Sequence, residues 1–168
     1  MRKIVIIFLL LCLHYLCFSM DKKDFTVQFN DEITIALEDI VTKSLIKTLN
    51  PERTIQINQD KKEPPIIDYY FDGLIIETSD NSKVSDILIS SDKYKLQSGL
   101  KVGDSLKTVL KRYEDTIPDT KNSNEEFYVL LYTYNLTAKD TWKEPKYYLI
   151  IRFKNEIVYD IELIFWDW

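Results

Sequence analysis

The last third of the sequence constrains the fold most, because apolar and polar residues alternate there over three successive runs. The runs span about 127–134, 147–153 and 157–168, and residues 154–156 form a short polar break between the last two. A period of two is typical of strands, since successive side chains point to opposite faces of a sheet. The pattern predicts a three-stranded antiparallel meander in which residues 154–156 are a tight turn.

The N-terminal half predicts a short strand at 25–29 and then a helix at about 31–49. Within that helix the apolar residues recur every four positions, as on one side of a helix. Asn50 and Pro51 would end it, since proline cannot continue a helix. The residues that carry this pattern are Ile33, Leu37, Val41, Leu45 and Leu49.

The middle of the chain predicts a hairpin and a second helix. Residues 69–78 and 84–91 flank the polar stretch 79–83, as two strands flank a turn. Gly103 then precedes Asp104 and Ser105, and either of these two can cap a following helix. The apolar face of that helix would consist of Leu106, Val109, Leu110 and Tyr113.

Together these elements predict an α+β fold with two helices packed on an antiparallel sheet of about five strands. The polar stretch 58–65 ends in two prolines and predicts a linker. It would separate a strand-and-helix part, 20–57, from a β-rich module, 66–168, within the single domain 20–168.

Position along the last strand predicts two partly apolar faces. Ile157, Tyr159, Ile161, Leu163 and Phe165 form a wholly apolar set, which we expect to face the core. The opposite set begins polar and ends in Trp166 and Trp168. Either helices cover one face and loops or the N-terminal segment partly cover the other, or an aromatic surface is left for a partner.

Residues 1–19 predict a cleaved secretory signal peptide. Arg2 and Lys3 give a positive start, an apolar run covers 4–13, and small residues precede a cut after Ser19. The chain is therefore expected in the periplasm or outside the cell. Lipid attachment at Cys17 is the alternative, although the bulky residues before that cysteine fit a lipoprotein signal poorly.

Loss of residues 1–19 would remove much of the catalytic repertoire. Both cysteines and the single histidine lie in that segment. The remainder would have no imidazole base, no thiolate nucleophile and no ordinary zinc site. We therefore expect a protein that is not an enzyme, with no catalytic residue, metal or cofactor. The net charge of −5, without a basic block, disfavours nucleic acid as a partner.

One stretch carries a family resemblance. Residues 94–105 read Tyr-Lys-Leu-Gln-Ser-Gly-Leu-Lys-Val-Gly-Asp-Ser, and the next helix ends at Tyr113. With Phe-Asp-Gly-Leu at 71–74 and the meander, residues 69–165 resemble the SmpA/OmlA (BamE-like) and β-lactamase-inhibitor-like domains of bacterial envelope proteins. The resemblance implies a loop shaped by Gly99, Gly103, Asp104 and Ser105, and a role in binding or bracing other proteins. Glu114 departs from it, because the family usually has glycine there.

The leading functional prediction is an exported envelope protein that binds another envelope or extracellular protein. Tyrosine and tryptophan are enriched at binding hot spots, and Trp142 lies in a polar loop. A secreted inhibitor of an extracellular hydrolase and a small-ligand or sugar-binding domain are the alternatives. The candidate partner-binding residues are Trp142, Trp166, Trp168, Tyr132 and Tyr148.

Overall fold

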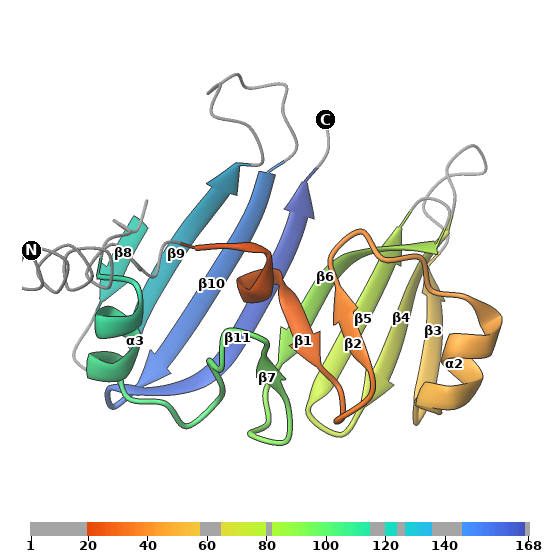
Figure 1. The fold of residues 1–168 in the computed structure, drawn as a ribbon, viewed down its shortest axis with the longest axis horizontal. Coiled ribbons are helices and arrows are strands. Elements are labelled where there is room, and N and C mark those ends of the chain that lie inside the picture. The colour runs from red at the N-terminus through yellow and green to blue at the C-terminus, as the bar shows by residue number, and fades with distance from the viewer. Residues whose placement is uncertain are drawn as a thin grey trace, which may run out of the picture.

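The computed structural model describes residues 20–57, 65–79, 82–114, 120–123, 127–135 and 146–166. These residues form an α+β fold, made mostly of strands, with two antiparallel sheets (Figure 1). The helical elements are the 3-10 turn η1 (Lys22–Phe25) and the helices α2 (Lys43–Leu49) and α3 (Leu106–Arg112). Among the described residues no helix has the length and apolar character to cross a membrane. The signal segment 1–19 and residues 58–64 of the linker lie outside them.

The large sheet has eight strands in the order β3-β4-β5-β6-β11-β10-β9-β8, and all neighbours are antiparallel. The N-terminal and C-terminal halves of the chain join in its middle, where β6 pairs with β11. The strands are β3 (Arg53–Ile57), β4 (Ile66–Phe71), β5 (Leu74–Ser79), β6 (Lys83–Ile89), β8 (Thr120–Ser123), β9 (Phe127–Asn135), β10 (Lys146–Lys154) and β11 (Ile157–Trp166).

A small sheet in the order β2-β1-β7 covers one face of the large sheet, together with η1 and α3 (Figure 1). Its strands are β1 (Thr26–Gln28), β2 (Thr34–Ala36) and β7 (Lys95–Leu96). Each strand buries one apolar side chain completely, namely Val27, Ile35 and Leu96. Burying a large aliphatic side chain stabilises a fold by roughly 1.5–3 kcal/mol. We expected two helices to cover this face of the large sheet, but the strands of the small sheet provide most of the cover.

The expected helix over 31–49 is wrong in its first half. Ile33, Ile35 and Leu37 alternate with Thr34 and Ala36, and β2 pairs with β1 there. Ile35 and Leu37 are buried, because the period of two places both on the core side. Only residues 43–49 are helical, and this helix begins after the cap Thr42 and ends at Asn50.

The expected single strand at 69–78 is also wrong, because it is a hairpin of β4 and β5. The chain reverses at Asp72-Gly73, and Gly73 has a φ of 81°. An Asp-Gly pair favours a two-residue hairpin turn. A side chain at position 73 would overlap Ser91, so glycine is also required for space.

Several expectations are confirmed. The strand near 26–28, the hairpin β5–β6 and the helix at 106–112 are present, and so are the three strands of the meander. The turn at 154–156 has Asn155 and Glu156 at positive φ, as a two-residue hairpin turn requires. The sheet has eight strands instead of about five because the expected strand 69–78 is two strands, and because β3 and β8 extend the sheet at its two edges.

The assignment of β11 side chains to the core face or the opposite face is correct only in the second half of the strand. The pairing of β10 with β11 steps from Arg152↔Asp160 to Phe153↔Val158, so Tyr159 is an extra residue in a β-bulge. A bulge changes which side chains face the core on either side of it. Val158 is therefore buried while Ile157 and Tyr159 are exposed, and Ile161 and Leu163 are buried as expected.

Candidate functional site

The large sheet has one face with no described element over it, which we call the open face. The small sheet, η1 and α3 pack on the opposite side, and α2 lies beside the edge strand β3 (Figure 1). The open face carries half-buried apolar side chains from six adjacent strands. The strand register places most of them in one row across the sheet, which Glu162 interrupts between Leu88 and Ile150. These side chains are Tyr70, Ile75, Leu88, Leu131, Tyr148, Ile150 and Ile164.

Charged side chains divide this apolar surface. Arg152 donates from Nη1 to Asp160 Oδ1 at 2.8 Å, and its Nη2 donates to Glu162. All three side chains are half-buried, so water screens these ion pairs less than it would at an exposed site. Burial raises the pKa of Asp160, although the bonded guanidinium opposes the shift. The arginine is thus held in place by two carboxylates.

A row of three carboxylates crosses the open face beside this cluster. The register places Asp68 opposite Glu77 and Glu77 opposite Asp86. Burial raises the pKa of Asp86 to about 7, and the charges of Glu162 and Glu77 add to the shift. Like charges at directly opposite positions destabilise a sheet. In the described part of the chain, Asp68 Oδ1 is buried and has no hydrogen-bond partner.

The structure places the predicted contact residues in different environments. Trp166 is 46% exposed at the end of β11, diagonally across from half-buried Tyr148 on the open face. Tyr132 is 1% exposed, and its ring lies 5.0 Å from that of Tyr113. Tyr132 therefore belongs to the core, because its strand turns Leu130 and Tyr132 inward. Trp142 and Trp168 lie outside the described residues.

The predicted loop residues anchor α3 to the sheet. Gly99 and Gly103 have φ values of 89° and 93°. The Gly103 N–H donates to the Val158 carbonyl, and the Val158 N–H donates to the Asp104 carbonyl, both at 2.9 Å. Ser105 provides the helix cap, since its Oγ accepts from the Thr108 N–H. Asp104 instead accepts from the Lys101 N–H. These contacts give the loop a structural role.

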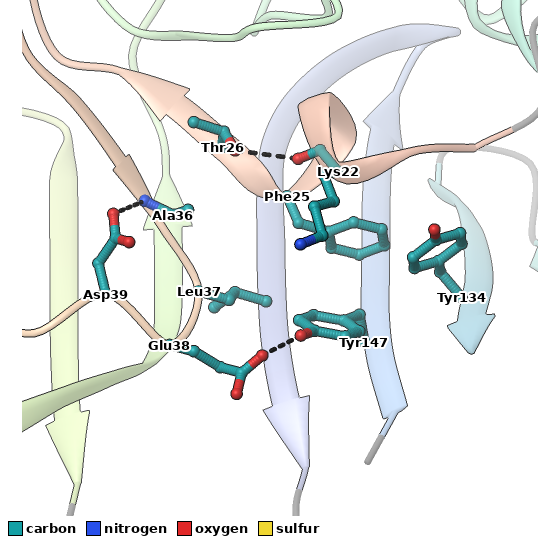
Figure 2. A pocket seen from close by; sticks show the side chains of 9 residues that line it. All are labelled: Lys22, Phe25, Thr26, Ala36, Leu37, Glu38, Asp39, Tyr134 and Tyr147. Atoms are coloured by element: carbon teal, nitrogen blue, oxygen red, sulfur yellow. Dashed lines mark hydrogen bonds between the residues drawn. The ribbon is translucent and has the colours of Figure 1, made fainter. Parts of the chain in front are cut away.

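A pocket of about 390 Å³ lies on the covered side, where η1 and β2 meet the ends of β9 and β10 (Figure 2). We call it the tyrosine pocket. Tyr147 lies directly opposite Tyr134 in the sheet, and the stacked rings of Phe25 and Tyr134 have centroids 5.6 Å apart. The lining residues are Lys22, Phe25, Thr26, Ala36, Leu37, Glu38, Asp39, Tyr134 and Tyr147.

Polar groups form the rim of this pocket. The Tyr147 hydroxyl donates to Glu38 Oε1, and Lys83 lies 3.9 Å from the other oxygen of that carboxylate. Burial and this bond raise the pKa of Tyr147 well above its usual range. No local sequence pattern predicts the pocket, because Glu38 and Tyr147 are 109 residues apart.

A buried carboxylate, also missed from the sequence, links η1 to α3. Asp24 is 4% exposed and accepts from the Tyr113 hydroxyl at 2.6 Å and from the Asp21 N–H at 3.0 Å. Burial raises the pKa of Tyr113, and the neighbouring Asp24 charge adds to this. Within the described ranges no group of three or more acidic, histidine or cysteine side chains is arranged to hold a metal ion. The hydrogen bond from Tyr113 to Asp24 joins the end of α3 to η1 in the core.

Comparison of the chain with protein-family models, curated proteins and solved structures finds no match. The resemblance of residues 69–165 to the SmpA/OmlA group therefore stays a prediction.

Proposed function

We propose that this chain is an exported, non-enzymatic envelope protein that binds another protein through the open face. One observation carries the proposal: half-buried apolar side chains from six adjacent strands share a face that no described element covers. Apolar side chains gathered on one uncovered face commonly mark an interaction site. The expected signal peptide and the resemblance to envelope proteins support the location.

The charges on the open face favour one kind of partner. Asp68, Glu77 and Asp86 stand in a row, and the nearby Arg152 already bonds Asp160 and Glu162. A lysine or arginine of the partner would relieve the repulsion in that row, while apolar partner residues would cover Ile150 and Ile164. The partner surface we propose is therefore apolar with basic groups.

Affinity capture tests the proposal. The full chain, carrying a C-terminal tag, is exposed to an envelope extract of its source cell, and bound proteins are identified by mass spectrometry. An open-face variant, Ile150→Ser with Ile164→Ser, should lose the captured partner. Leu110→Ser is the matched control, because Leu110 is an exposed apolar residue on α3, away from this face.

The supporting result is one protein retained by the wild type and by Leu110→Ser and lost by the open-face variant. Circular dichroism must show all three folded. Equal capture by all three would overturn the proposal. The inhibitor alternative adds a further expectation, namely that the captured protein is an extracellular hydrolase whose activity falls on binding.

A further inference from the structure

The tyrosine pocket is a separate feature from the open face, since it lies on the covered side of the sheet (Figure 2). Its volume of about 390 Å³ falls at the lower end of the roughly 300–1,000 Å³ typical of small-molecule sites. Three aromatic rings lie against one another in its wall. Phe25 and Tyr147 are buried, and Tyr134 is half-buried and packs against the core. The pocket therefore combines the size and the apolar wall of a ligand site.

The polar groups of the pocket are held in place before any ligand arrives. Glu38 has a left-handed backbone with a φ of 68°, and its N–H donates to the Val84 carbonyl at 2.8 Å. One oxygen of Asp39 accepts from the Ala36 N–H at 2.7 Å. The Thr26 hydroxyl donates to the Lys22 carbonyl at 2.9 Å, which holds the backbone from which the Lys22 side chain extends. Preorganised groups lower the entropy that binding must overcome.

The charges around the pocket balance. Glu38 and Asp39 provide two carboxylates, and Lys22 and Lys83 provide two ammonium groups. Lys22 has no ion-pair partner in the described part of the chain, and Figure 2 shows its side chain extending toward the rings. A cationic ligand would meet Lys22 and an anionic ligand would meet the two acids. These two carboxylates and two ammonium groups therefore favour a neutral ligand that both donates and accepts hydrogen bonds.

We infer that the tyrosine pocket binds a saccharide. A sugar ring offers apolar C–H faces, which pack on aromatic rings, and hydroxyl groups, which both donate and accept. Its hydroxyls donate to Glu38 and accept from Lys22, while one face of the ring covers Tyr134. The pocket size fits a monosaccharide or the end of a glycan chain.

Nuclear magnetic resonance titration of the ¹⁵N-labelled full chain tests this inference. The probes are glucose, galactose, mannose and N-acetylglucosamine, with choline as a cationic probe and benzoate as an anionic one. At least one sugar should shift the amide signals of residues 22–39 and 147 with saturation. Tyr134→Ala should weaken that binding by about tenfold or more, because it removes the stacking surface.

Tyr148→Ala is the matched control, since Tyr148 follows Tyr147 on β10 but faces the open side of the sheet. It should leave sugar binding unchanged. If Tyr134→Ala does not fold, Lys22→Gln at the exposed rim decides the matter and should weaken binding severalfold. The inference is overturned if no sugar shifts these signals, if Tyr148→Ala weakens binding equally, or if choline or benzoate binds more tightly than every sugar.

Discussion

At the scale of single residues, the most unusual group is Asp86. It is a half-buried carboxyl on the open face, with Glu77 opposite on β5 and Glu162 on β11. Burial and these two like charges raise its pKa from 3.8 to about 7, and Arg152 offsets only part of the shift. The folded protein therefore binds a proton at Asp86 in a range where the unfolded chain does not.

That difference predicts a pH-dependent stability. Between pH 4 and pH 7 the folded state holds the proton and the unfolded state does not, so the free energy of unfolding falls as pH rises through this window. Asp86→Asn should remove that fall and stabilise the protein at pH 8 by about 1–4 kcal/mol. Urea unfolding at pH 5 and pH 8 measures both effects.

Asp92→Asn, at an exposed position after β6, is the matched control and should not change the pH dependence. A stability difference between Asp86→Asn and the wild type that is the same at both pH values would contradict the assignment.

At the scale of elements, β11 shows how one extra residue alters the faces of a strand. The bulge at Tyr159 lets Val158 and Ile161 both point into the core although they are an odd number of residues apart. Deletion of Tyr159 would leave Asp160 paired with Arg152 and Val158 paired with Phe153, now in a continuous register.

We therefore predict that the Tyr159 deletion folds with a loss of roughly 1 kcal/mol or less, within the range of ordinary surface changes. Deletion of Glu162 is the matched comparison, because it would shift the rest of β11 by one residue and move Leu163 out of the core. That variant should not fold cooperatively. Thermal unfolding followed by circular dichroism distinguishes the two variants. An equal loss of stability in both would show that Tyr159 is not an extra residue in a bulge.

The same elements show what the sequence could predict. The meander was predictable because its alternation is local and its turn has two residues. The helix over 31–49 was not, because Ile33 and Leu37 satisfy both a period of four and a period of two. Pairing with β1 decides between them, and that contact depends on tertiary structure. The Asp72-Gly73 pair is typical of a two-residue hairpin turn, so the sequence does contain a local signal for the reversal between β4 and β5.

The candidate sites were harder to predict. Trp166 and Tyr148 lie on the same face of the sheet, as the alternation of side chains along each strand suggested. Tyr132 lies on the other face. Alternation sorts the residues of β9 into two sets but does not say which set points into the core. The tyrosine pocket joins η1, β2 and the β10 strand, which are far apart in the sequence. No local spacing could have found it.

At the scale of the whole molecule, the β6–β11 pairing unites the two halves of the large sheet. Two of its four residue pairs, Ile89↔Ile161 and Ile87↔Leu163, consist of completely buried residues. Buried strands in the centre of a sheet open only with the whole fold, whereas edge strands open locally.

Native-state hydrogen exchange should therefore show the slowest amides in β6 and β11, with the same free energy of opening as global unfolding. β3, at the edge and mostly exposed, should exchange faster. Nuclear magnetic resonance resolves these amides individually. Exchange of β11 at a clearly lower free energy than β6 would show that the two halves unfold separately.

The position of β11 in the chain also matters during synthesis. A ribosome releases the N-terminal strands first, at roughly 5–20 residues per second. β6 ends at Ile89, but the residue that pairs with it, Ile161, is made only several seconds later. Until then β6 pairs only with β5, and its other edge is an unpaired row of backbone groups, which is a template for pairing with another chain. During synthesis the newborn chain therefore exposes an edge of β6 that β11 covers in the finished fold.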